Sequence, residues 1–221
     1  MSRVNRHPPV HSVNQAAYDA EAEATGWLGP EIAFALMHSY LVPGQAVLEI
    51  GIGTGLAAML FHKAGLVVHG LDLDPTMLTA CRRKGFTHLI RHDLRHMPYP
   101  YPARSMHGVV CVGVFQFFRR LGPVFREVGR ILRPGGCFVF VVGDRAGCDH
   151  TSWVVEAALT HTGRPVTMYR HSERQIIGWL TPAGLVPLDQ VAFTMFMDRA
   201  RTRSFPVRTY LAQRKNTLNP D

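Results

Sequence analysis

No hydrophobic run in this 221-residue sequence is long enough to cross a membrane. The longest nearly uncharged apolar runs, residues 108–118 and 137–143, fall far short of the roughly 20 residues that a bilayer requires. The first ten residues are basic and contain no apolar segment of the kind found in secretory signals. We therefore expect no membrane partner and no secretory signal.

Cysteine pairs are missing as well. The four cysteines show no CxxC spacing, and two of them lie in apolar, strand-like runs. This pattern is typical of reduced thiols, because disulfides form mainly outside the cytoplasm. We expect a cytoplasmic protein without disulfide bonds.

Charge is sparse and biased toward one sign. Charged residues make up 18% of the chain and apolar residues 47%, which excludes wholesale disorder and supplies one packed core. Basic residues number 24 against 16 acidic ones, so the formal net charge is +8. Residues 199–215 contain no acid. A solvated basic edge is the simpler interpretation of this stretch, and contact with nucleic acid or an anionic small molecule is the alternative.

Short hydrophobic runs alternate with stretches of helical period. That alternation is typical of parallel strands joined by helices that cover both faces of a sheet. We predict an α/β fold with a doubly wound, Rossmann-like sheet of seven strands, mostly parallel with an antiparallel last strand. The expected strands are residues 46–50, 67–71, 88–91, 109–115, 137–142, 185–197 and 205–211.

Start signals place the helices between these strands. Asp74 followed by Pro75 is typical of an N-cap with proline in the first turn. Ser172 and Gln175 fit a capping box. Further helices are expected after Gly29-Pro30, over residues 121–132, and from Ser152 to Thr160.

The segment VLEIGIGTGL joins a predicted strand to a predicted helix through three glycines. Because Gly51, Gly53 and Gly55 have no Cβ, their backbone can take positive φ and let a ligand approach the main chain. A dinucleotide-binding turn would carry glycine at the position of Leu56. With Glu49 two residues before the first glycine, the turn suits a cationic amino end better than a pyrophosphate.

Further acids follow the next two strands. Asp74 is already explained as a helix cap, so Asp72 is left to point from the strand tip into the crevice, where its carboxylate would accept both hydroxyls of a ribose. Asp93 follows the third strand, and an acid there can accept a hydrogen bond from the exocyclic amine of a purine. A loop cap is the simpler interpretation of Asp93.

These motifs resemble those of class I S-adenosylmethionine-dependent methyltransferases over about residues 40–145. VLEIGIGTGL looks like the family's first motif, GLDLDPTML like its ribose-acid motif, and RHDLRHMPYP like its adenine-acid motif. GVVCVGVFQFF followed by FREVGRILRPGG looks like the fourth strand, the next helix and its turn. The segment from Ser172 to Leu185 resembles the small-molecule, methyltransferase type 11/25-like branch. The resemblance implies S-adenosyl-L-methionine as cofactor and a small-molecule methyl acceptor as partner.

The resemblance also implies roles for single residues. Glu49 and the glycine turn would hold the methionine end of the cofactor, and Asp72 would bind the ribose. Leu73 would contact one face of the adenine, and Asp93 and Leu94 would contact its edge. Val114 and Gln116 would lie near the sulfonium, and Tyr18 would belong to an N-terminal lid. Two positions depart from the family pattern. His107 stands where an aspartate is usual, and Gln116-Phe117 replaces a common histidine pair, which puts an inherited catalytic histidine in doubt.

Acceptor binding is expected outside the resembling core. We expect residues 1–40 to form a helical lid and residues 41–221 to form the cofactor-binding domain, with an acceptor-site insert at about residues 144–171. Methyl transfer from a sulfonium needs mainly alignment, and a general base only for some acceptors. The candidate bases of the insert are Asp144, Cys148, His150, His161, Tyr169 and His171, of which His150, Tyr169 and His171 are kept as weak catalytic candidates.

Other interpretations compete with this one. His88, His92 and His96 recur every four residues but span a strand and a loop, so we expect no metal site. An RNA methyltransferase would suit the net charge, but the sequence shows no NPPY or DPPY quartet and no recognisable RNA-binding module. A protein that binds S-adenosylmethionine without turnover is the third alternative. The sequence does not specify the acceptor, its reacting atom or the oligomeric state.

Overall fold

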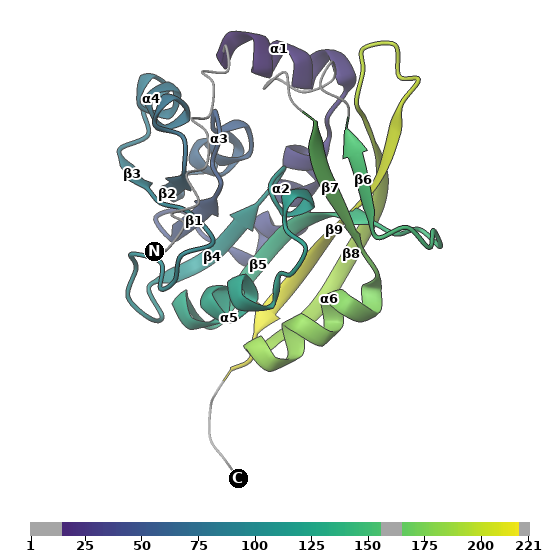
Figure 1. Ribbon diagram of the computed structural model, residues 1–221. Coiled ribbons are helices and arrows are strands. Elements are labelled where there is room, and N and C mark those ends of the chain that lie inside the picture. The colour runs from purple at the N-terminus through teal and green to yellow at the C-terminus, as the bar shows by residue number, and fades with distance from the viewer. Residues whose placement is uncertain (1–14, 156–164, 217–221) are drawn as a thin grey trace, which may run out of the picture.

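A nine-stranded mixed sheet runs through the centre of the protein, whose computed structural model describes residues 15–155 and 165–216 (Figure 1). Along its main path the strand order is β3 (His88–Arg91), β2 (Val67–Asp72), β1 (Ala46–Ile50), β4 (Met106–Cys111), β5 (Leu132–Asp144), β7 (Val166–His171) and β6 (Ser152–Val155). β9 (Ser204–Arg214) lies antiparallel to β5 and also pairs with β8 (Leu185–Phe196). The predicted doubly wound α/β fold is therefore confirmed, with a parallel centre and an antiparallel edge.

The sheet has nine strands instead of the predicted seven, because the insert contributes two of its own. Residues 152–155 form β6 and not the start of a helix, and β6 pairs antiparallel with β7. Trp153 and the two valines after it favour a strand once a partner strand is present, which overrides a weak helical pattern. The rest of the predicted helix, up to Thr160, lies outside the described residues.

The fourth strand also ends earlier than predicted. β4 stops at Cys111, and the chain leaves the sheet through Gly113, which has a φ of 77°. The short helix η2 (Phe115–Phe117) follows where the sequence analysis expected strand. Phe115 is fully buried, whereas Phe117 is 46% exposed. The apolar run therefore predicts the burial of Phe115 correctly but not its secondary structure.

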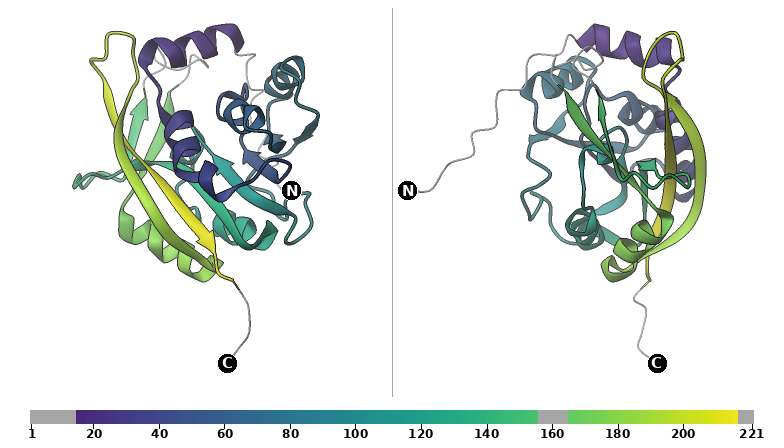
Figure 2. Two further views of the ribbon diagram at one scale, coloured as in Figure 1. Left: turned by 180° about the vertical axis from the view of Figure 1, so that it is seen from behind. Right: turned by 45° about the vertical axis from the view of Figure 1, so that its right-hand side comes forward.

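Helices cover both faces of the sheet (Figure 2). One face packs against α2 (Gly29–Met37), α3 (Leu56–Lys63) and α4 (Pro75–Arg83), and the other against α5 (Gly122–Ile131) and α6 (Glu173–Leu180). Helix α1 (Gln15–Thr25) lies across one end of the sheet, beside the tip of the β8–β9 hairpin. Two single-turn helices, η1 (His38–Tyr40) and η4 (Thr181–Ala183), follow α2 and α6. None of the helices in the described ranges is long and apolar enough to cross a bilayer.

The predicted helix caps are present. The Asp74 carboxylate accepts the main-chain N–H of Thr76 at 2.8 Å, at the start of α4. At α6, the main-chain N–H of Gln175 donates to Ser172 Oγ, and Gln175 Oε1 accepts the main-chain N–H of Ser172. All four cysteines are free thiols, as predicted.

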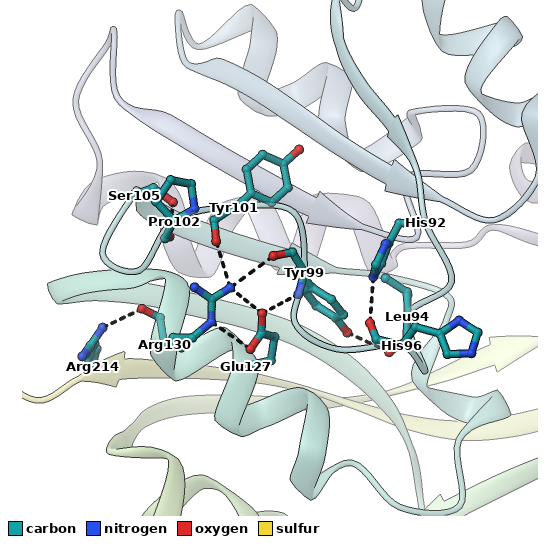
Figure 3. A network of polar contacts seen from close by, with 10 residues as sticks. All are labelled: His92, Leu94, His96, Tyr99, Tyr101, Pro102, Ser105, Glu127, Arg130 and Arg214. Carbon is teal, nitrogen blue, oxygen red and sulfur yellow. Dashed lines mark hydrogen bonds and ion pairs between the residues drawn. The ribbon is translucent and has the colours of Figure 1, made fainter.

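An ion pair with a buried glutamate fixes the loop that follows β3 onto α5 (Figure 3). Glu127 accepts the main-chain N–H of Tyr99 at 2.6 Å and the Nε–H of Arg130 at 2.9 Å. Arg130 in turn donates to the carbonyl oxygen of Tyr101 at 2.8 Å. Burial disfavours the charge of Glu127, but the hydrogen bonds from Arg130 and Tyr99 outweigh it and lower the pKa of the Glu127 carboxyl. The loop therefore depends on an ionised glutamate.

Replacing Glu127 with glutamine tests this dependence. We expect E127Q to lower the free energy of unfolding at neutral pH by about 1–3 kcal/mol, because buried donors lose a charged acceptor. The folded-state pKa of Glu127 lies below its ordinary value, so the contribution is complete above the unfolded-state pKa and is lost as the pH falls through the folded-state pKa. Urea unfolding at several pH values measures it. E23Q, at an exposed glutamate of α1, is the matched control, and identical curves for E127Q and wild type at pH 7 would contradict the prediction.

Candidate functional site

A cavity of about 220 Å³ opens at the carboxyl ends of β1, β2 and the chain that continues β4. In an open α/β sheet this edge, where the strand order reverses, is the usual place for a ligand. The cavity is lined by Tyr18, Trp27, Pro30, Glu49, Gly51, Ile52, Gly53, Thr54, Leu56, Ala57, Asp72, Asp74, Met77, Val112, Gly113 and Val114. Of the residues predicted from sequence, it brings together Tyr18, Glu49, Gly51, Gly53, Asp72 and Val114.

The glycine turn forms one wall of the cavity. Gly51, Gly53 and Gly55 have φ values of 74°, 54° and 84°, in the left-handed region that disfavours side chains. A Cβ on Gly51 would also lie 2.3 Å from Val114 Cγ2. Gly55 does not line the cavity; it forms the N-cap of α3. The three glycines are thus required by the turn, and two of them face the cavity.

Asp72 fixes the position of this turn. Its Oδ2 accepts the main-chain N–H of Gly53 at 2.8 Å, and its Oδ1 accepts the main-chain N–H of Asp74 at 2.9 Å. Burial raises the pKa of the Asp72 carboxyl, and hydrogen bonds from the main chain of Asp74, Gly53 and Leu73 oppose this shift. Each oxygen keeps a second lone pair for a ligand. The sequence analysis assigned Asp72 a contact with a ligand and missed its contact with the glycine turn, which joins residues 19 positions apart.

Glu49 is the buried acid of the cavity. Only 3% of the residue is exposed, and its Oε2 has no hydrogen-bond partner among the residues that the structure describes. Burial raises the pKa of the Glu49 carboxyl well above its usual value; the main-chain N–H of Ala58 opposes this shift and the nearby Asp72 charge adds to it. An unpaired acid in such a place favours a cationic ligand, because a positive charge would compensate the buried carboxylate. The cavity therefore suits a ligand with a cationic end.

Helix α1 covers the cavity and is held by charged contacts. Asp19 accepts the Thr54 hydroxyl at 2.5 Å and the Lys84 ammonium at 2.7 Å. Lys84 also donates to the Thr54 carbonyl oxygen at 2.8 Å, so the helix is tied to the glycine turn. Sequence reasoning missed Asp19, Thr54 and Lys84, since no local pattern connects residues so far apart in the chain.

Five predicted contacts lie outside the lining of the cavity. Leu73 is 40% exposed, next to Asp72, and Gln116 is buried in η2. Leu94 packs into the core on the α5 face of the sheet. The carboxylate of Asp93 pairs with Arg95, and this hydrogen-bonded pair lowers the pKa of Asp93 to about 2. Gly55 and these four residues do not line the cavity.

The candidate bases of the insert do not line the cavity either. His150 is exposed in a loop, and Tyr169 is half-buried on β7. His171 is 2% exposed and packs against the ring of Trp179, which belongs to the core around α6. Burial lowers the pKa of His171, and the main chain of Phe118 and Arg119 opposes this shift.

The remaining residues singled out from the sequence have contacts of their own. Asp144 accepts Arg208 Nε at 2.9 Å, and Cys148 Sγ lies 3.6 Å from Nη1 of Arg170. His107 Nδ1 accepts the main-chain N–H of Ala46 at 3.2 Å, a contact between β4 and β1. His161 lies outside the described residues.

Part of the chain is similar in sequence to known methyltransferases. The family described as "Methyltransferase domain" matches residues 48–140. The malonyl-[acyl-carrier protein] O-methyltransferase of Serratia marcescens is 30% identical over 142 residues, which are 62% of this chain and 53% of that protein. A demethylmenaquinone methyltransferase of Tropheryma whipplei is 30% identical over 98 residues, 43% of this chain and 41% of that protein. The chain thus spans about half or less of the length of these curated relatives.

A solved structure shows the same fold. A SAM-dependent methyltransferase from Methanosarcina mazei superposes with a TM-score of 0.68 at 15% sequence identity, covering 81% of this chain and 97% of that one. The region matched by the family contains the glycine turn, Asp72 and Asp93 in the order that the sequence motifs predicted. Residues 48–140 thus match a methyltransferase-domain family, and the chain has the fold of a solved S-adenosylmethionine-dependent methyltransferase.

Proposed function

We propose that this chain transfers a methyl group from S-adenosylmethionine to a small-molecule acceptor. The observation that carries the proposal is the pair of acids formed by buried Glu49 and half-buried Asp72, at a glycine turn on the carboxyl edge of the sheet. A cation with two vicinal hydroxyls is the ligand whose chemistry meets both acids. The acceptors named for the curated relatives, a malonyl-carrier protein and demethylmenaquinone, differ from each other, so we assign neither acceptor to this chain.

Each acid has a distinct role in this proposal. Glu49 and the glycine turn hold the methionine end, and Asp72 accepts the ribose hydroxyls while it keeps its two main-chain donors. Leu73, Asp93 and Leu94 flank the adenine, and Val114 with Gln116 borders the methyl-transfer centre. To bind the edge of the adenine, the Asp93 carboxylate has to accept a hydrogen bond from it while it stays paired with Arg95.

Rate enhancement in this proposal comes from alignment and the exclusion of water. The bound cofactor supplies a methyl group that is already activated for displacement. Tyr18 and Trp27 close the cavity from the side of α1. Burial raises the pKa of the Tyr18 hydroxyl, which keeps it a neutral hydrogen-bond donor. Holding nucleophile and methyl carbon in contact distance accounts for most of the catalysis expected here.

The basic C-terminal stretch supports a small molecule over RNA, because much of it is engaged within the chain. Arg199 pairs with Glu21 at 3.1 Å, and Arg208 pairs with Asp144 at 2.8 Å. Arg214 donates to the carbonyl oxygens of Arg130 and Leu132. We further propose a helical lid over residues 1–40, acceptor contacts from about residues 144–171, and a cytoplasmic location, which the free thiols support.

Cofactor binding and turnover test the proposed function separately. Calorimetry with S-adenosylmethionine and S-adenosylhomocysteine is expected to show one site per chain. Release of S-adenosylhomocysteine is expected with at least one pool of small-molecule acceptors. Binding without turnover on any pool would favour a cofactor-binding protein, a salt-dependent gel shift with RNA would favour the RNA methyltransferase, and no binding of either compound would contradict the proposal.

Removing the Asp72 carboxylate is expected to weaken the affinity for S-adenosylhomocysteine. D72A should cost about 1–3 kcal/mol of binding free energy, on the order of 5- to 150-fold in Kd, because ribose hydroxyls and the Gly53 N–H lose an acceptor. D72N, which keeps one acceptor oxygen, should fall between D72A and wild type. D189A, at an exposed aspartate of β8, is the control. Wild-type affinity in D72A would remove Asp72 from the site.

Glu49 makes cofactor binding pH-dependent. Its raised pKa keeps the free carboxyl protonated to a higher pH than usual, and a bound cation favours the ionised form. S-Adenosylmethionine should therefore bind more tightly as the pH rises through the pKa of free Glu49, and binding below that pKa should release protons. Calorimetry in two buffers of different ionisation enthalpy measures the release. E49Q should bind with a smaller pH dependence; equal proton release in E49Q and wild type would refute this role.

A further inference from the structure

Arg170, on β7, carries a side chain that no function described so far uses. Its guanidinium carbon lies 5.1 Å from the ring centroid of Phe205 and 5.5 Å from that of Trp153. The two ring centroids are themselves 5.3 Å apart. These three similar separations place the guanidinium in contact with both rings.

The charge of Arg170 has no acidic partner among the residues that the structure describes. Its side chain donates to Cys148 Sγ from Nη1, at 3.6 Å, and the buried Nε has no hydrogen-bond partner. A thiol is a weak acceptor, and an unsatisfied buried N–H is costly. The edge formed by Nε and Nη2 is the one that binds a carboxylate through two parallel hydrogen bonds.

Arg170 points to the same face of the sheet as the cofactor cavity. It pairs with Gly143 of β5, and Gly143 lies on the face of Val139 and Val141, which pack with Val112 of the cavity wall. Because β5 also pairs with Cys111, the residue before Val112, strand geometry puts the Cα atoms of Arg170 and Cys111 on the order of 10–15 Å apart. A small acceptor spans that distance.

A cluster of mainly aromatic side chains, here called the aromatic wall, extends from the cofactor cavity to Arg170. Trp27, which lines the cofactor cavity, packs in one hydrophobic cluster with Trp153, Phe193, Met195 and Phe205. The rings of Trp27 and Phe193 have their centroids 5.8 Å apart. The rings at the far end of this cluster are those that hold the guanidinium of Arg170. Figure 1 shows β6, β7 and the β8–β9 hairpin side by side at this end of the sheet, next to α1.

We propose that Arg170 binds a carboxylate of the methyl acceptor, so that the acceptor is a small molecule with an apolar body and an acidic end. The apolar body lies along the aromatic wall, and the carboxylate pairs with Nε and Nη2 of Arg170. This inference rests on the proposed methyltransferase function and adds the chemical class of its substrate. Arg170 is a specificity-determining residue in this account and takes no part in methyl transfer itself.

Matched pairs of neutral and charged ligands test the proposal on the full chain loaded with S-adenosylhomocysteine. The probes are octanoate with octanamide, and 4-phenylbutyrate with 4-phenylbutyramide. For at least one pair, calorimetry should show the carboxylate binding at least tenfold more tightly than its amide. R170Q should reduce that ratio to about 1, and R170K should retain part of it. R174Q removes the same charge from an exposed position on α6, across the sheet, and should leave the ratio unchanged.

The outcomes separate this proposal from the function on which it rests. Binding of S-adenosylhomocysteine to wild type and R170Q reports on the cofactor site alone and should be equal. If the cofactor binds but neither carboxylate is preferred in wild type, or if the preference survives in R170Q, the role of Arg170 is overturned and the methyltransferase function stands. If R170Q does not fold, ¹⁵N-arginine labelling of wild type gives the answer: the Nε signal of Arg170 should shift with the carboxylate and not with the amide, and an unmoved signal overturns the proposal.

Discussion

The hydrogen bonds from the Asp72 carboxylate to Gly53 and Asp74 hold the candidate site together. Through them the tip of β2 fixes both the glycine turn after β1 and the start of α4. The turn then brings Glu49 to the base of the cavity, and Thr54 in the same turn supplies the contacts that hold α1. A carboxylate that arranges two main-chain amides in this way is pre-organised for a ligand before the ligand arrives, which lowers the cost of binding.

Sequence patterns predicted most of the central fold because they report burial on two faces of a sheet. The strands at residues 46–50 and 88–91 and the caps at Asp74 and Ser172 agree with the structure, since each depends on residues close in the chain. The insert was predicted wrongly as a helix at residues 152–155, because its strand exists only through pairing with β7. Local signals do not report a distant partner strand.

The site was predictable to a similar extent and for the same reason. The glycine turn, Glu49 and Asp72 belong to short motifs, and the structure brings them to one cavity. Trp27 lines the cavity from a segment far away in the chain, and Asp19 and Lys84 tie α1 to the glycine turn. None of the three belongs to a motif that the sequence analysis used. Asp93 stands at the expected place after β3, yet its carboxylate pairs with Arg95 two residues later, a contact that a list of family positions does not reveal.

The two ends of this face of the sheet favour ligands of opposite charge, and this difference connects the cofactor cavity with the chemical class of the acceptor. The cofactor end holds buried acids that favour a cation, and the far end of the aromatic wall holds an arginine without an acidic partner among the described residues. The cationic cofactor and an acidic acceptor would therefore bind at opposite ends of the same face of the sheet. Helix α1 lies over this region and is tied by ion pairs to Lys84 beside the glycine turn and to Arg199 of the β8–β9 hairpin.

The central claim is that the acidic, glycine-walled cavity is built for S-adenosylmethionine. A crystal structure of the full chain grown with S-adenosylhomocysteine tests it most directly. The account predicts the ligand in this cavity, with both ribose hydroxyls within hydrogen-bond distance of Asp72 and the amino end of the ligand beside the glycine turn and Glu49. A ligand bound elsewhere on the chain, or one in this cavity whose ribose does not touch Asp72, would contradict it.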